Sequence, residues 1–430
     1  MITLPEKFIQ NMKKQLPQTE WEAFFAVYEN KAYKGVRLNP LKGGRYELSG
    51  ILGEQIPWEE NGFYTALEKT GASPFHFAGL FYSQEPSAMS AAPLLNVKPG
   101  ERVLDLCSAP GGKGTQLACA MGGKGLIVLN EPVSSRAKIL SGNVERMGIT
   151  NAVVTCETPE KLAQIFENYF DKILVDAPCS GEGMFRKNTE EALSEWSEEN
   201  VALCAARQKR ILTEAVKMLK AGGRLVYSTC TFAPQEDEEQ AAWFCEEFPQ
   251  MRLISQEKLY PHKIKGEGHF VALFEKCGEE TRARVRETKL FIPKESERAF
   301  RVFEKECLKN LSFSNLHEVG GVIYALPEHV FDFKGVFVLR AGLRLGEVKN
   351  GRFEPSHSLA LATKKGDWKN AVDLAETDPR LEKYLRGETI EETIVKNGWC
   401  VVCVAGFPIG LGKAVNGTIK NHMPKGLRKN

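Results

Sequence analysis

Between residues 102 and 276, short apolar runs alternate with longer stretches in which apolar residues recur with a helical period. The apolar runs have the length of buried strands, and the stretches between them are expected to form helices. This alternation predicts βαβ units and a parallel, doubly wound α/β sheet. The expected strands are Arg102–Cys107, Leu126–Glu131, Asn151–Cys156, Asp171–Ala177, Arg224–Cys230 and His269–Lys276. The expected helices are Thr115–Met121, Ser134–Met147, Glu160–Tyr169, Glu198–Leu219 and Glu236–Phe248.

The pattern changes on both sides of this region. Residues 1–50 predict an amphipathic helix followed by a basic stretch at residues 31–42, and residues 87–97 predict a short helix. Beyond residue 280 the apolar runs are short and are separated by glycine-rich turns. We therefore expect one or two small α+β modules after the sheet.

Composition indicates a globular protein. The chain has 430 residues, of which 43% are hydrophobic and 26% charged, and this excludes a disordered or collagen-like protein. Its apolar runs stay below the ~18 residues that a membrane span needs. The first residues carry charge in every turn, so we expect no signal peptide. Eleven cysteines without a secretory signal indicate free thiols in a reducing cytoplasm, which is the predicted location.

Charge is unevenly distributed along the chain. The net charge is +2, but residues 151–250 hold 10 basic and 18 acidic side chains. Residues 401–430 hold five basic side chains and no acidic one. The ends of the chain are therefore suited to binding a polyanion. A solvated basic tail explains the same charges equally well.

A glycine-rich turn, Asp105-Leu-Cys-Ser-Ala-Pro-Gly-Gly-Lys113, follows the first expected strand and opens a helix. Glycines and the free N–H groups of a helix N-terminus suit a ligand that approaches the backbone. The turn is not a Walker A loop, because Cys107 stands where glycine is needed and Gly114 follows Lys113. It also lacks the third glycine of a dinucleotide fingerprint. The alternative is a tight turn that only caps the helix.

Two cysteines stand at the ends of neighbouring strands. The fourth expected strand runs into Asp176-Ala-Pro-Cys179, and the fifth ends at Cys230. In a doubly wound sheet these strands lie side by side, and their carboxyl ends face the ligand cleft. We therefore expect two thiols and a carboxylate to converge beside a cofactor.

This arrangement suits methylation of cytosine at carbon C5. A thiolate that adds to carbon C6 makes C5 nucleophilic, and a carboxyl close to N3 stabilises the developing charge. A base must then remove the C5 proton before the thiol can leave. A lone cysteine is usually a core residue, and we assign Cys119, Cys204 and Cys245 to that class.

No metal site is expected. Cys179 and Cys230 lack the CxxC partner that a zinc site needs. Cys400-x-x-Cys403 has no second pair or nearby histidine, and its apolar surroundings predict a strand in the core.

Four segments together resemble the Nol1/Nop2/Sun family of RNA (cytosine-5)-methyltransferases: Tyr82–Ser87, Asp105–Lys113, Asp176–Arg186 and Ser228–Phe232. The resemblance implies a class I S-adenosylmethionine-dependent methyltransferase with a Rossmann-like sheet. It also implies that Cys230 is the nucleophile that attacks C6 and that Cys179 assists release of the product. Asp176 would lie between the cofactor and the base.

The same resemblance implies a binding site for S-adenosyl-L-methionine. Its methionine end and ribose would be wrapped by Cys107, Ser108, Ala109, Pro110, Gly111, Gly112 and Lys113. Glu131, at the end of the second strand, would bind the ribose hydroxyls, with Arg136 nearby. Relatives often place an aspartate near the adenine after the third strand, whereas this chain has Glu157 and Thr158. Which of these two contacts the adenine stays open.

The ends of the chain resemble the RsmF-like (YebU-like) bacterial branch of the family. The similar segments are Arg37–Asn39, Glu354–Ser358, Gly406–Gly410 and Asn421–Arg428. The resemblance implies an N-terminal RNA-binding module (1–90), a catalytic domain (91–280), a small C-terminal domain (281–365) and a PUA-like RNA-binding domain (366–430). It implies 16S rRNA, in the small ribosomal subunit, as the substrate.

Three alternatives remain. A tRNA substrate keeps the chemistry, but the C-terminal modules disfavour it. In DNA cytosine methyltransferases the Pro-Cys thiol is the nucleophile, which would exchange the roles of Cys179 and Cys230; the Thr229-Cys230 pair argues against this. The third alternative is an RNA-binding ribosome-assembly factor with an inactive core. No membrane, metal or obligate protein partner is expected.

Overall fold

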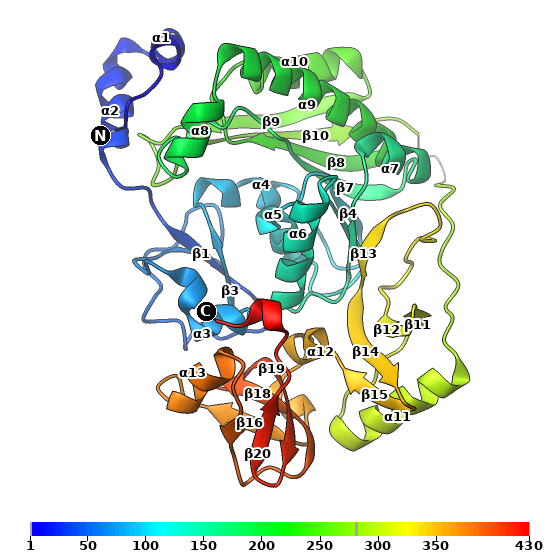
Figure 1. The fold of residues 1–430 in the computed structure, drawn as a ribbon. Coiled ribbons are helices and arrows are strands. Elements are labelled where there is room, and N and C mark those ends of the chain that lie inside the picture. The colour runs from blue at the N-terminus through cyan, green and yellow to red at the C-terminus, as the bar shows by residue number, and fades with distance from the viewer. Residues whose placement is uncertain (1, 280–282, 430) are drawn as a thin grey trace.

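The computed structural model describes residues 2–279 and 283–429. The domain boundary expected between residues 280 and 281 lies outside the described residues. At the centre is an eight-stranded sheet with the order β13-β6-β5-β4-β7-β8-β10-β9 (Figure 1). Its strands are β4 (Arg102–Asp105), β5 (Leu126–Asn130), β6 (Ala152–Thr155), β7 (Phe170–Asp176), β8 (Leu219–Thr229), β9 (Met251–Leu259), β10 (His269–Lys276) and β13 (Val338–Ala341).

Strands β4 to β8 are parallel, which confirms the predicted doubly wound sheet. Strands β9, β10 and β13 are antiparallel to their neighbours. β9 and β13 were not foreseen as strands of this sheet. β13 comes from the C-terminal region and pairs with β6. The chain between these two strands is about as long as a whole domain, so no local pattern predicts the pairing.

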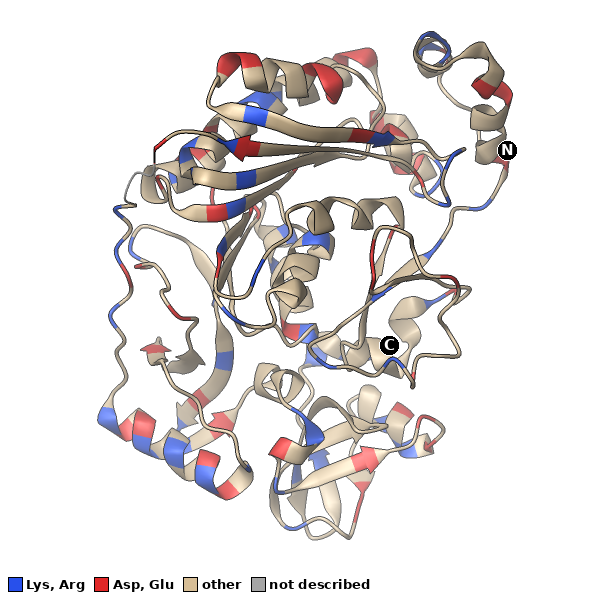
Figure 2. Ribbon diagram, turned by 180° about the vertical axis from the view of Figure 1, so that it is seen from behind, with Lys and Arg blue, Asp and Glu red and all other residues tan. Residues whose placement is uncertain are grey.

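Helices cover both faces of the sheet. α4 (Ala91–Leu94), α5 (Gly112–Ala120) and α6 (Ser134–Arg146) pack on one face. α7 (Pro159–Ile165), α9 (Glu198–Met218) and α10 (Glu238–Glu247) pack on the other. Acidic side chains gather on α10, at the outer edge of the molecule (Figure 2).

The N-terminal region contains a small sheet that the sequence did not predict. Helices α1 (Glu6–Gln15) and α2 (Trp21–Ala26) precede it, and the segment after β7 contributes α8 (Thr189–Glu195) beside them. The sheet has the order β2-β1-β3, with α3 before its last strand. Its elements are β1 (Gly35–Leu38), β2 (Gly62–Tyr64), α3 (Pro74–Phe77) and β3 (Phe81–Gln84). β1 lies within the basic stretch at residues 31–42, and all of its residues are buried.

Two α+β modules follow the central sheet, as expected. The first contains α11 (Lys294–Cys307), β11 (Leu316–Val319), β12 (Val322–Ala325), β14 (Leu343–Lys349), β15 (Arg352–Pro355) and α12 (His357–Ala362). The second contains β16 (Ala371–Leu374), α13 (Pro379–Leu385), β17 (Ile390–Glu391), β18 (Gly398–Val404), β19 (Phe407–Val415) and β20 (Thr418–Asn421). In Figure 2, basic and acidic side chains alternate along α11.

The two ends of the chain share one hydrophobic core. Phe75 and Leu80 of the N-terminal region belong to the same buried cluster as Ile409 and Met423 of the last module. Figure 1 shows α3 and β3 next to α13 and β19, with the C-terminus between them. Burial of these apolar side chains therefore holds both ends of the chain against each other. None of the helices in the described part of the chain is long and apolar enough to cross a membrane.

Candidate active site

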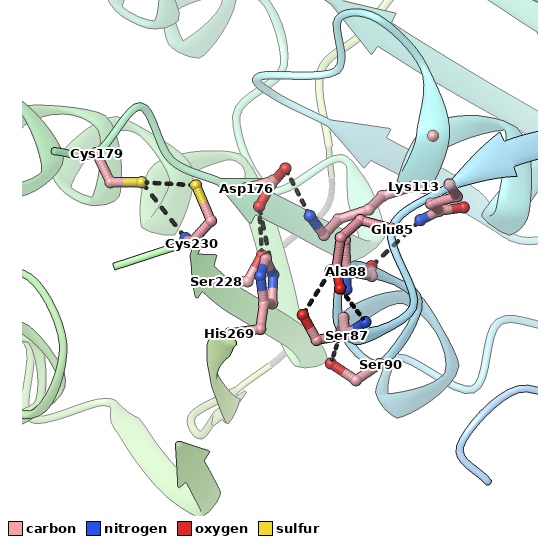
Figure 3. Close-up of polar contacts among 12 residues, drawn as sticks. Glu85, Ser87, Ala88, Ser90, Lys113, Asp176, Cys179, Ser228, Cys230 and His269 are labelled. Carbon is pink, nitrogen blue, oxygen red and sulfur yellow. Dashed lines mark hydrogen bonds and ion pairs between the residues drawn. The ribbon is translucent and has the colours of Figure 1, made fainter. Parts of the chain in front are cut away.

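Three neighbouring strands of the central sheet end in polar side chains on one face. Asp176 of β7 pairs with Ser228 of β8, and Thr229 of β8 faces Phe270 of β10. Because side chains alternate along a strand, Asp176, Ser228 and His269 point to the same face. The next residues on that face are the buried apolar Leu174, Val226 and Val271. The carboxyl edge of the sheet thus carries a polar layer, shown in Figure 3, and the buried apolar residues lie beneath it.

The two cysteines come together at this edge. The Sγ atoms of Cys179 and Cys230 lie 3.3 Å apart, and the backbone N–H of Cys230 donates to the Cys179 sulfur over 3.4 Å. Both side chains are half-buried. The hydrogen bond with Cys230 and burial raise the pKa of Cys179 well above its ordinary value. Cys179 is therefore a protonated thiol beside a second sulfur.

Asp176 is ionised and firmly held. Its Oδ2 atom lies 2.8 Å from Lys113 Nζ, and its Oδ1 atom accepts a hydrogen bond of 2.8 Å from Ser228 Oγ (Figure 3). Burial acts to raise the pKa of Asp176, but the charge of Lys113 and the hydrogen bonds from Lys113 and Ser228 outweigh it and lower this pKa below its ordinary value. A third of the side chain (33%) is exposed, so the carboxylate remains accessible from the cleft.

Two glycines of this turn and of the helix start stand where a side chain would be strained or would collide with neighbouring atoms. Gly111, before the first residue of α5, has φ +111°, a conformation that favours glycine. A Cβ atom on Gly114 would press on Ser108 Oγ and come within 2.8 Å of Asp105 Oδ2. Arg136 also donates to the Ala109 carbonyl over 3.0 Å. The expected cofactor residues Cys107–Lys113 thus form one fixed loop, which Lys113 connects to Asp176.

Asp105 is a candidate that the sequence analysis did not single out. It ends β4, is fully buried, and neither carboxylate oxygen has a hydrogen-bond partner among the described residues. Burial raises its pKa to about 7. An unpaired buried carboxylate is costly unless a ligand supplies the partner. The sequence could have identified Asp105 by its position, because ligands bind at the carboxyl ends of the strands in such a sheet.

The two acidic residues expected near the ribose and adenine differ in their surroundings. Glu131 is buried, lies 3.2 Å from Arg136 and accepts a hydrogen bond from the backbone of Val133. Glu157 accepts hydrogen bonds from Phe337 N and from Lys161, each over 2.7 Å. The Glu157 carboxylate is thus bound to the chain itself, including the segment that leads into β13.

Several residues with candidate roles are structural. Phe185, within the Asp176–Arg186 segment, is fully buried and packs on Phe8 with 5.0 Å between the ring centroids. Cys400 and Cys403 are buried in β18. In the basic tail, Lys429 pairs with Glu382. Among the residues described, no cluster of potential metal ligands occurs.

The Arg37–Asn39 segment, which resembles part of an RNA-binding module, faces inward. Arg37 is 1% exposed and donates to the carbonyl of Gly112 over 2.6 Å and to Thr115 Oγ1 over 2.7 Å. Asn39 is buried and donates to the carbonyls of Gly79 and Met147. These two side chains join the N-terminal region to the catalytic sheet.

Four family models match successive parts of the chain. They are described as the N-terminal domain of 16S rRNA methyltransferase RsmF (residues 4–86), 16S rRNA methyltransferase RsmB/F (92–275), the first C-terminal domain of RsmF rRNA methyltransferase (302–363) and the RsmF PUA domain (370–429).

Curated relatives match almost the whole chain. Ribosomal RNA small subunit methyltransferase F from Shewanella piezotolerans is 32% identical, over 99% of this chain and 97% of the relative. The protein of the same name from Enterobacter sp. is 31% identical, over 99% and 96%.

Solved structures share the central fold. A methyltransferase homologue from Pyrococcus horikoshii is 27% identical with a TM-score of 0.56, over 63% of this chain and 95% of that one. The structure of NSun6 from Pyrococcus horikoshii with SFG, at 19% identity and a TM-score of 0.58, has the same fold over 64% of this chain and 99% of that one.

Proposed function

Since the chain belongs to the RsmF family of 16S rRNA methyltransferases, we propose that it transfers a methyl group from S-adenosylmethionine to carbon C5 of a cytosine in 16S rRNA. The observation that carries this proposal is the pair of sulfur atoms 3.3 Å apart beside an ionised carboxylate. Cytosine C5 is a weak nucleophile, and addition of a thiolate at C6 is the step that activates it. A site with two thiols supports that chemistry, because one can attack while the other handles the proton at C5.

The two cysteines take different roles. Cys230 attacks C6 and forms a covalent adduct with the base, as the resemblance of Ser228–Phe232 implies. Cys179 assists release: the C5 proton passes to the Cys179 sulfur while the Cys179 thiol proton passes to the Cys230 sulfur, and the bond from C6 to Cys230 breaks. The raised pKa of Cys179 keeps it protonated, so it does not compete as a nucleophile. The Asp176 carboxylate would accept a hydrogen bond from the amino group of the base and so help to hold the base against Cys230.

The residues of the cofactor loop fit S-adenosylmethionine. When bound, this cofactor supplies an electrophilic methyl group on a sulfonium. Residues Cys107–Lys113 would surround its methionine end, where the unpaired Asp105 carboxylate suits an ammonium group. Glu131, supported by Arg136, would accept hydrogen bonds from the ribose hydroxyls. Lys113 connects this loop to Asp176 and so aligns the cofactor side of the cleft with the base side.

The substrate proposal follows the family. The relatives are named for the small ribosomal subunit, and the four matched segments support a division into N-terminal, catalytic, first C-terminal and PUA-like domains at residues 1–90, 91–280, 281–365 and 366–430. A base in RNA must be unstacked to reach such a site, so the target cytosine belongs to an accessible loop or junction. An rRNA substrate is met in the cytoplasm, which we propose as the location.

The first experiment would measure methyl transfer by the wild-type protein and by Cys230→Ala. Unmethylated small subunits, naked 16S rRNA and tRNA would be offered with labelled S-adenosylmethionine, and Cys277→Ala, at an exposed cysteine, would be the control. We expect label in 5-methylcytosine of 16S rRNA and a loss of at least about 10⁴-fold for Cys230→Ala.

Each other outcome would overturn one part of the proposal. Label confined to tRNA would change the substrate. Equal label with Cys230→Ala would remove Cys230 as the nucleophile. No label with any RNA, although the protein binds the cofactor, would favour the inactive assembly factor.

A further inference from the structure

His269 is a buried histidine whose hydrogen-bonding capacity is unused. It is 1% exposed, and neither ring nitrogen has a hydrogen-bond partner among the described residues. Its nearest polar contact, from Nε2 to Asp176 Oδ1, is 3.8 Å and too long for a hydrogen bond. Buried polar atoms in proteins are almost always paired. An ordered water or a ligand can supply the missing partner.

The topology places His269 on the base side of the cleft. The cofactor loop follows β4, and the strand order continues from β4 through β7 and β8 to β10. Asp176 and Cys230 stand at the ends of the two middle strands, and His269 is the first residue of β10. By strand order, His269 therefore stands on the far side of Cys230 from the cofactor loop. Its ring lies beside Ser228, near Asp176 (Figure 3).

The charge of His269 narrows the choice of partner. Burial, and then the nearby charge of Lys113, lower the pKa of His269 to about 3. The imidazole is therefore neutral, with one ring nitrogen that donates and one that accepts. A neutral donor and acceptor pair suits the edge of a nucleobase. It does not suit a phosphate, for which a cationic side chain is favoured.

We propose that His269 hydrogen-bonds the Watson–Crick edge of the target cytosine and, together with Asp176, selects that base. This assignment rests on the proposed function. Enzymes that extrude a base read it by hydrogen bonds to this edge. Cytosine carries an amino donor beside ring and carbonyl acceptors, so a neutral imidazole and a carboxylate complement it. His269 takes no part in the covalent steps, which belong to the cysteines.

The test compares two substitutions at this position. His269→Phe keeps a planar ring but cannot hydrogen-bond, whereas His269→Asn keeps one donor and one acceptor. His329→Phe, at an exposed histidine, is the control. Methyl transfer to unmethylated small subunits would be measured at varied RNA and varied S-adenosylmethionine concentrations, with the melting temperature of each protein.

We expect His269→Phe to lower kcat/KM for the RNA by about 10- to 100-fold, since Asp176 alone then reads the base. His269→Asn should recover part of this loss. KM for S-adenosylmethionine and the melting temperature should stay at the wild-type values, which a packing role would not predict.

Three results would overturn the assignment. His269→Phe could retain wild-type kcat/KM for the RNA. It could lose affinity for S-adenosylmethionine or melt early in proportion to its lost activity, which would make His269 a packing residue. If the wild-type protein methylated none of the RNAs, the proposed function itself would be wrong. If the wild type were active and His269→Phe were equally active, only the role assigned to His269 would be wrong.

Discussion

The first turn of helix α5 separates two clusters of buried polar side chains that behave differently. On one side, both terminal nitrogens of the Arg37 guanidinium are hydrogen-bonded, to Gln84, Gly112 and Thr115, and only its Nε atom has no partner among the described residues. On the other side, Lys113 binds Asp176, but the His269 ring nitrogens and the Asp105 oxygens have no partner in the described part of the chain. The bonds of Arg37 join two regions of the protein. The unpaired groups at the sheet edge are available for ligands.

Whether a buried polar side chain is hydrogen-bonded within the protein thus distinguishes residues that stabilise the fold from residues that bind ligands. Both kinds are buried, and Arg37 and Asp105 both lie in segments that resemble the same family. A satisfied hydrogen bond stabilises the fold, whereas an unsatisfied buried group costs stability unless a ligand pairs with it. Substitutions at the catalytic edge should therefore change activity at nearly constant stability, and substitutions at the Arg37 junction should do the reverse.

The largest effect is expected at Cys179. Cys179→Ser should lower multiple turnover of RNA by about 10³-fold, because release of the covalent product lacks its proton-handling group. A protein–RNA adduct should accumulate and be visible on a denaturing gel, with the melting temperature unchanged. Cys277→Ser, at an exposed cysteine, is the control. Absence of the adduct together with lost activity would instead support Cys179 as the nucleophile.

Arg37→Met should be the most destabilising substitution at the junction. It leaves the Gly112 carbonyl, Gln84 and Thr115 without their buried donor, so the free energy of unfolding should fall by about 4 kcal/mol. Denaturant titration would measure this against Arg207→Met, at an exposed arginine of α9. If Arg37→Met unfolded like the wild type but bound RNA weakly, Arg37 would contribute to RNA binding and not to stability, and the distinction between the two clusters would be wrong.

The core shared by the two ends of the chain offers a third test. Ile409 is fully buried in it, so Ile409→Ala should cost about 3 kcal/mol. Val415→Ala, at a partly exposed position of the same strand, should cost much less. Hydrogen exchange should show lost protection in β1 and β3 as well as in the last module. If only the last module lost protection, the two ends would be independent units.

The smallest effect concerns pH. The folded pKa of Asp105, about 7, lies above the ~3.9 of an unfolded aspartate, so its contribution to stability is present below about pH 4 and is lost as pH rises through 7. Without cofactor, the wild type should therefore lose about 2 kcal/mol more stability than Asp105→Asn between pH 5 and 8. Denaturant midpoints at several pH values would measure this. Parallel curves for the two proteins would contradict it.

The parallel strands of the central sheet were predictable because their apolar runs alternate with helical stretches. The ends of these strands follow from the same pattern, and that is why Cys179 and Cys230 could be placed side by side. The N-terminal sheet was not predictable, since its strands have three or four residues and β1 lies within a basic stretch of the sequence. β13 was missed because its partner, β6, lies far away along the chain.

The sequence by itself determined the class of fold, the family and the residues at the ends of the central strands. These are local properties, set by the period of apolar residues and by short motifs. Only the tertiary structure decided which buried polar groups are paired. Arg37 became a structural residue because Gln84, Gly112 and Thr115 surround it. His269 became a candidate for reading the base because neither ring nitrogen has a hydrogen-bond partner in the described part of the chain. Pairing depends on neighbours from distant parts of the chain, and no local pattern records them.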